Sequence, residues 1–226
     1  MDVVAPLGDY LLRMRNESPT RDRGGYISPS QVGGCQQWAL NQLRNEPREN
    51  NQDPWMYPFF EVAHDIHRLY QRLGVEAKIL DPSSVEKWVE YEPLRIGGSI
   101  DGQLVSGPLF EIKTVNERKF HVICGNNRIP EYMWKQNHCY MKAAGVWETR
   151  FLLINRNTPN QVREFEFKWN DDVWEEVEKW CTQVLDKLDG GDFPEQFNYE
   201  DCMGCTYWNF NRNKFMIGPG GLKKVV

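Results

Sequence analysis

Residues 94–115 read LRIGGSIDGQLVSGPLFEIKTV, and this stretch decides the fold. Apolar residues alternate with polar ones on both sides of Ser106-Gly107-Pro108, three residues that favour a turn. The pattern predicts two strands joined in a hairpin. In the second strand Glu111 and Lys113 share one face, because side chains alternate with period two.

A hairpin centred near Ser106 places Asp101 across from Glu111, with the two Cβ atoms roughly 5 Å apart. Two facing carboxylates repel each other unless a cation lies between them, and a hard divalent ion such as Mg²⁺ or Mn²⁺ prefers oxygen ligands. Lys113, further along the same face, can then hold a water beside the metal. The alternative is a solvated sheet face, because Glu-x-Lys occurs by chance in a chain with 26% charged residues.

The composition predicts one globular α/β domain. A chain of 226 residues can bury a core, and its mean hydropathy is −0.65. It contains no apolar run of ~20 residues and no secretory signal pattern, so we expect a cytoplasmic protein, or one in the host cytoplasm if it is viral. Six cysteines in a reducing compartment bind metal more often than they pair. The net charge of −5 requires any nucleic acid to bind a local basic groove.

Periodicity and capping signals predict the remaining elements. We expect a polar arm over 1–25, a single domain over 26–212 and a tail over 213–226. The predicted helices begin at Ser28 and at Phe59 and cover 131–144 and 171–188. The predicted strands cover 75–80, 89–94, 151–154 and 162–169, with a short strand or loop at 120–123.

Two of these helices carry polar residues at helical spacing. On the helix from Phe59, His67 falls on the apolar stripe, whereas His64 lies on the polar flank. An inward histidine is most often a hydrogen-bonded core residue, and a metal ligand is the alternative. On the helix 131–144, Gln136 and Tyr140 are four residues apart and project from one face, as ordinary surface residues also do.

The cysteines form a third pattern. Cys202-Met-Gly-Cys205 is a knuckle that can place two thiolates on one metal ion or cluster. Cys35 lies far away in the sequence, near the start of the first predicted helix. We expect these three cysteines to meet in space and to join the two ends of the domain.

Taken in order, four motifs resemble the series of the RecB-like branch of the PD-(D/E)XK nucleases. They are Ala63-x-x-x-His67, Ile100-Asp101-Gly102, Glu111-Ile112-Lys113 and Gln136-x-x-x-Tyr140. The family usually has glycine where this chain has Ala63. The resemblance covers about 26–212 and implies a restriction-endonuclease-like fold, in which helices flank a mixed central sheet.

The resemblance also implies roles for these residues. One or two Mg²⁺ or Mn²⁺ ions would be held by His67, Asp101, Glu111 and the backbone carbonyl of Ile112. Lys113 would orient the attacking water. Gln136 and Tyr140 would steer Lys113 or a phosphate. Basic residues after the hairpin would line the DNA path or belong to a solvated loop: Arg118, Lys119, Arg128 and Lys135.

The cysteines resemble those of the iron–sulfur subgroup, which includes CRISPR-adaptation nucleases and small phage exonucleases. That subgroup has a further cysteine where this chain has Asn211. The alternatives for Cys35, Cys202 and Cys205 are a [4Fe–4S] cluster with an atypical fourth ligand, a Zn²⁺ site, or a site that has lost its metal. Cys124, Cys139, Cys181 or a histidine could supply the fourth ligand.

The implied activity is a metal-dependent DNA exonuclease acting on single strands or DNA ends, in recombination, repair, replication or CRISPR adaptation. A structure-specific endonuclease and a non-catalytic DNA-binding subunit are the alternatives. Because the sequence contains no helicase region, unwinding would need a helicase, recombinase or CRISPR-adaptation partner.

Overall fold

The structure is a computed structural model that describes residues 4–17, 25–46, 56–193, 207, 215–218 and 221–224. The chain divides into two compact units. The sheet unit contains residues 26–34 and 61–182, and the terminal unit contains 1–25, 35–60 and 183–226. The domain limits expected from the sequence are not tested by this division and stay a prediction.

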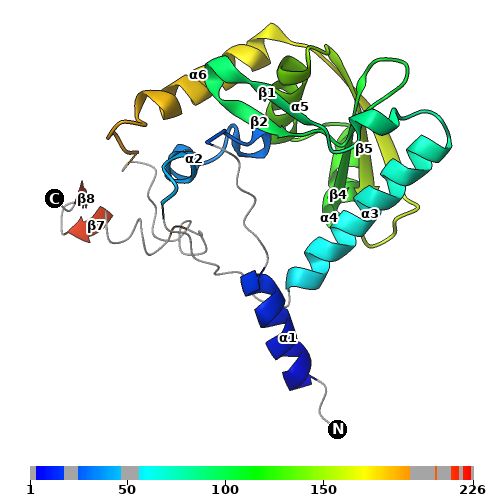
Figure 1. Cartoon of the computed structure of the whole chain (residues 1–226), viewed down its shortest axis with the longest axis horizontal. Coiled ribbons are helices and arrows are strands. Elements are labelled where there is room, and N and C mark those ends of the chain that lie inside the picture. Colours follow the sequence, from blue (N-terminus) through cyan, green and yellow to red (C-terminus); the bar gives the residue numbers. More distant parts are fainter. Residues whose placement is uncertain are drawn as a thin grey trace. The chain divides into compact units, whose positions relative to one another are not determined.

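A four-stranded sheet forms the centre of the sheet unit, with the strand order β3-β4-β5-β6. Its two central strands, β4 and β5, are labelled in Figure 1. The strands are β3 (Gly102–Gln103), β4 (Leu109–Val115), β5 (Glu148–Asn155) and β6 (Val162–Lys168). β4 and β5 run parallel, whereas β3 and β6 are antiparallel to their neighbours. The sheet is therefore mixed and has helices against it, as predicted.

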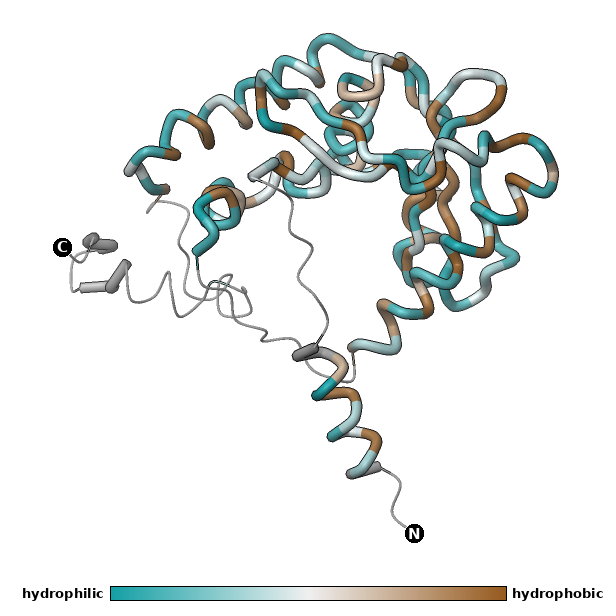
Figure 2. The backbone as a smooth tube through the Cα atoms, viewed as in Figure 1, coloured by the Kyte–Doolittle hydropathy of each residue, from teal (hydrophilic) through white to brown (hydrophobic). Residues whose placement is uncertain are grey.

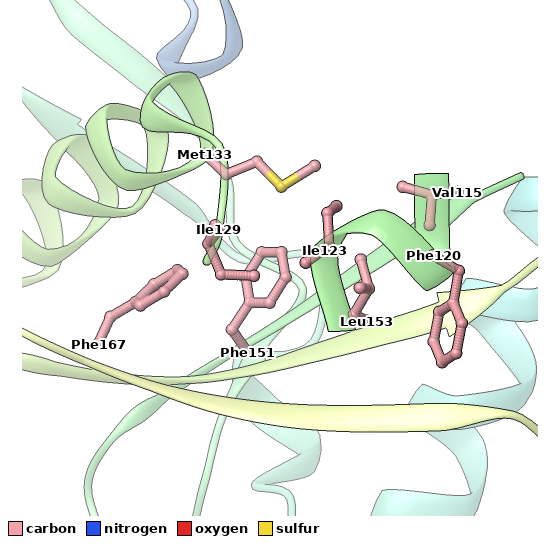
Figure 3. Packing of buried hydrophobic residues seen from close by; sticks show 8 residues of the cluster. All are labelled: Val115, Phe120, Ile123, Ile129, Met133, Phe151, Leu153 and Phe167. Atoms are coloured by element: carbon pink, nitrogen blue, oxygen red, sulfur yellow. The ribbon is translucent and has the colours of Figure 1, made fainter. Parts of the chain in front are cut away.

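One face of this sheet is covered by α4 (Glu117–Asn126) and α5 (Glu131–Ala144). Phe151 and Leu153 of β5 pack there against Phe120, Ile123 and Met133 (Figure 3). Since side chains alternate along a strand, Glu111 and Lys113 of β4 share a face with Leu109 and Val115, which also contact these helices. The carboxylate of Glu111 therefore lies on the α5 side of the sheet.

The opposite face is covered by α3 (Tyr57–Glu76). Ile66 of α3 packs against Ile112 of β4 and Ile154 of β5, whose side chains point away from α5. The hydrophobic stripe of α3 therefore packs on the face that does not bear the carboxylates, opposite α5.

The predicted hairpin is present, but its first strand is split. β2 (Ile96–Ser99) leaves the central sheet and pairs with β1 (Trp88–Tyr91) in a second, two-stranded sheet. A Cβ atom on Gly97 would lie 2.7 Å from Trp88, and one on Gly102 would lie 2.7 Å from Leu80. Glycines at these two positions thus allow close packing on both sides of the break at Ile100-Asp101.

Three other local predictions were wrong. Residues 75–80 form no strand, because α3 continues to Glu76 and the carbonyl of Gly74 then accepts bonds from two following amides. Residues 120–123 belong to α4, whose first turn is capped by Asn116. The helix predicted from Ser28 is divided by Gly33, which has a φ of 84°. Its two parts are a 3₁₀ turn (Pro29–Gln31) and α2 (Gln36–Leu43).

The helices predicted over 131–144 and 171–188 are confirmed as α5 and α6 (Asp171–Asp186). α5 ends at Gly145, which takes the left-handed conformation expected of a C-terminal glycine. α6 begins where the side chain of Asn170 accepts bonds from two backbone amides. Figure 2 shows hydrophilic and hydrophobic segments alternating along α6, as a helix with one buried face requires.

In the terminal unit, Arg44 holds the residues that follow α6. Its guanidinium donates to the carbonyls of Leu188 and Gly191 and pairs with Asp192 at 3.1 Å. A positive charge is favourable after a helix because the last carbonyl groups of the helix have no hydrogen-bond donor within it. This unit also contains α1 (Val4–Glu17) and a hairpin of β7 (Phe215–Gly218) and β8 (Gly221–Lys224). No helix among the described residues is both long and apolar enough to cross a membrane.

Candidate active site

Asp101 and Glu111 face each other, as the hairpin predicted. Gly102 pairs with Phe110, so the next step in this register sets Asp101 opposite Glu111. The Oδ2 atom of Asp101 accepts a 2.7 Å hydrogen bond from the backbone N–H of Ile112. That bond replaces the missing sheet partner at this point of β4 and fixes the Asp101 carboxylate beside the strand.

Gln136 of α5 joins Glu111 to Lys113. Its Nε2 donates to Glu111 Oε1 at 3.0 Å, and its Oε1 accepts from Lys113 Nζ at 2.9 Å. The lysine Nζ lies 3.8 Å from the same glutamate oxygen. The amide therefore orients both charged groups, and it is only 5% exposed. The steering role that the resemblance implied for Gln136 stays a prediction.

The surroundings of Glu111 oppose a negative charge. Burial raises the pKa of this carboxyl well above its ordinary value, and the charges of Asp101 and Glu86 raise it further. Lys113 acts in the opposite direction but does not compensate. A cation beside the two carboxylates would remove this electrostatic cost.

The two histidines of α3 lie in different surroundings. His67 Nδ1 is 3.4 Å from Asp101 Oδ1, and the His67 side chain is mostly buried. His64 is exposed, with its Nδ1 3.7 Å from Glu61 on the same helix. Of the two, the structure thus brings His67 to the carboxylates.

Two residues of this site were missed by the sequence reasoning. The buried side-chain amide of Gln71, one turn after His67, donates from Nε2 to the backbone carbonyl of Asp101 and to Glu86 Oε1, both at 3.0 Å. Glu86 adopts a φ of 54°, a conformation that costs a non-glycine residue energy. The spacing of four residues from His67 was a signal for Gln71. No local pattern marks Glu86, which lies in a loop.

Tyr140 lies one turn beyond Gln136, in an apolar cluster with Val89, Ile100 and Leu109. Its ring packs against Gly98, where a Cβ atom would lie 3.3 Å from the ring. The structure therefore places Tyr140 in the wall behind the site. Its role toward Lys113 or a phosphate stays a prediction.

The basic residues named for a DNA path differ in their availability. Lys135 is mostly buried and pairs with Glu131 at 2.6 Å and with Glu176 at 2.9 Å. Its ammonium group is therefore not available to contact a DNA backbone. Lys119 is exposed and donates to the hydroxyl of Tyr132 at 2.8 Å. A phosphate could compete for Lys119 but would have to displace two carboxylates from Lys135.

The donor atoms at the site suit a hard divalent cation: two carboxylates, an imidazole and a backbone carbonyl. N–H and C=O of one strand residue point to the same edge, so the carbonyl of Ile112 faces the edge that Asp101 occupies. In the described part of the chain, no three His, Cys, Asp or Glu side chains lie close enough together to hold a metal ion. Binding would have to bring His67, Asp101 and Glu111 closer.

Of the three cysteines predicted to form a site, Cys35 lies among the described residues. Cys35 is exposed at the start of α2, and Cys202, Cys205 and Asn211 lie outside the described residues. Cys139 and Cys181 are fully buried; burial raises the pKa of the Cys139 thiol well above its ordinary value and that of Cys181 to about 12. These two are poor thiolate ligands and pack as core residues.

Comparison with known proteins gives structural likenesses but no sequence relatives. No family model and no curated protein matches the chain. The alkaline exonuclease LHK-Exo from Laribacter hongkongensis aligns with a TM-score of 0.58 and 17% identity, over 74% of this chain and 89% of that one. The structure of LHK-Exo in complex with dAMP aligns with a TM-score of 0.57, at the same identity and coverage. The crystal structure of SSO0001 aligns with a TM-score of 0.56 and 13% identity, over 99% of both chains. The protein therefore shares the fold of an alkaline exonuclease.

Proposed function

We propose that this protein is a metal-dependent deoxyribonuclease of the PD-(D/E)XK type that degrades DNA from ends or as single strands. The observation that carries the proposal is the Asp101–Glu111 pair, with Lys113 tied to Glu111 through Gln136. This arrangement lies in a fold that is also found in an exonuclease, one that has been solved with the deoxynucleotide dAMP.

The residues divide the chemistry as follows. His67, Asp101, Glu111 and the carbonyl of Ile112 would hold one or two Mg²⁺ or Mn²⁺ ions, and the metal supplies Lewis-acid polarisation of a phosphodiester and of water. Lys113, oriented by Gln136, holds the attacking water and offsets the negative charge that develops on the phosphate.

A cleavage assay on end-labelled DNA tests the proposal. Single-stranded, linear duplex and closed circular substrates are incubated with Mg²⁺, Mn²⁺ or EDTA. We expect mononucleotides or short products from the linear substrates with metal, and intact DNA with EDTA. Cleavage of the closed circle would instead indicate an endonuclease. Binding without cleavage at any metal concentration would identify a non-catalytic subunit and refute the proposal.

For the cysteines we propose a structural metal or iron–sulfur site formed by Cys35, Cys202 and Cys205. Such a site would connect the start of α2 to the chain after α6 and would stabilise the terminal unit, since metal binding couples to folding. Unwinding of duplex DNA would come from a helicase, recombinase or CRISPR-adaptation partner.

A further inference from the structure

A lysine is surrounded by aromatic rings at the end of α5. Lys142 Nζ lies 5.1 Å from the ring centre of Trp174, 5.4 Å from that of Tyr91, 5.6 Å from Trp169 and 6.0 Å from Trp147. These four residues come from β1, α6 and the two segments that flank the β5–β6 pair. A cation near the faces of such rings is attracted by their electron density.

The rings also support one another. Trp147 packs edge-on against Trp169 with centroids 4.9 Å apart, and Trp169 and Tyr91 each lie 5.5 Å from Trp174. Trp174 is buried, but Trp147 is 53% exposed. Trp147 therefore combines a largely exposed ring with contacts to a second indole and a lysine, which restrict the motion of that ring.

A surface hollow of about 480 Å³ lies beside this indole. It is lined by Gly107 and Pro108 of the hairpin turn and by Trp147, Glu148, Lys168 and Trp169. Glu148 is paired with Arg150, and Lys168 with Glu166. Lys142 forms no ion pair with any carboxylate in the described part of the chain. Behind the aromatic lining of the hollow, Lys142 thus adds a positive charge that no carboxylate of the described residues neutralises by an ion pair.

We propose that this hollow is a subsite in which one nucleobase of single-stranded DNA stacks on Trp147. A base offers a flat π surface to the indole, and its phosphates are attracted by the charge of Lys142. The choice of DNA as ligand rests on the proposed nuclease function. Pro108 precedes Glu111 by three residues, which is ~10 Å of extended chain or about three nucleotides at 3.4 Å each. The subsite would thus hold a base close to the cleavage site.

Binding to labelled oligodeoxythymidylate in EDTA tests the subsite without cleavage. Trp147→Ala should weaken binding roughly 5- to 150-fold, the range expected for loss of one base–aromatic stack, and Trp147→Phe should keep most of the affinity. The matched control is Trp88→Ala, which removes a different exposed indole, one that lies in β1, and should leave binding unchanged. Circular dichroism confirms that each variant is folded.

An abasic oligonucleotide of equal length separates stacking from charge. Wild type should bind it more weakly than thymidylate, whereas Trp147→Ala should bind both alike. Equal weakening of both ligands by Trp147→Ala, no effect of that change, or no binding of single-stranded DNA by wild type would overturn the subsite. Base-dependent binding through Trp147 in a protein that cleaves no DNA would keep the subsite and refute only the nuclease proposal.

Discussion

Glu111→Gln in the metal-free protein tests the electrostatics of the site most directly. Burial and Asp101 raise the pKa of Glu111 in the folded state above the value of 4.5 that it has in an unfolded chain. Between these two pKa values the folded protein binds one proton more than the unfolded protein. Its stability therefore falls as the pH rises, by at most about 1.4 kcal/mol per pH unit. The glutamine variant lacks this proton and this dependence.

The assay is thermal unfolding in EDTA from pH 5 to pH 8. For a chain of this size, 1 kcal/mol changes Tm by about 2–4 °C, so wild type should lose up to roughly 3–6 °C per pH unit relative to Glu111→Gln. Excess Mn²⁺ should raise the stability of wild type by about 2.7 kcal/mol at 100 times Kd, and should raise that of the variant less. Glu175→Gln, at an exposed position of α6, is the control and should follow wild type. Parallel curves for wild type and Glu111→Gln across this range would refute the reasoning.

The other predictions concern individual ligands and supports. Asp101→Ala or Lys113→Ala should abolish cleavage without a loss of helical circular dichroism, and normal turnover by either variant would remove it from the active site. His67→Ala should require more Mn²⁺ for half-maximal cleavage than His64→Ala does; equal requirements would contradict the choice of His67. Gln71→Met should leave the Asp101 carbonyl and the Glu86 carboxylate without their shared donor, cost about 0.5–1.5 kcal/mol of stability and weaken Mn²⁺ binding measured without DNA; unchanged Mn²⁺ affinity would exclude a positioning role. Protein purified anaerobically should contain iron and sulfide, or else stoichiometric zinc, at the three predicted cysteine ligands. A folded, active and metal-free protein would show that the site is dispensable.

The sequence alone determined the features that depend on local periodicity. Alternation along the strand and the turn before Leu109 were sufficient to set Asp101 opposite Glu111, with Lys113 on the same face. In α5, the glycine at 145 fixed the end of the helix, and helical spacing set the face that carries Gln136. These signals lie within about a dozen residues of each other, so the chain geometry relates them before any packing is considered.

Only the tertiary structure decided the features that depend on partners distant in the sequence. Either face of the sheet would have buried the stripe of α3, and the complementary fit of Ile66 with β4 and β5 selected the one away from α5. Gln71 reaches Asp101 and Glu86 only once that helix is in place. The rings around Lys142 come from four separate segments, and no spacing within any one of them indicates that they meet. The physical reason is that side-chain packing depends on the complementary shapes of two surfaces, whereas periodicity identifies only the residues that each surface carries.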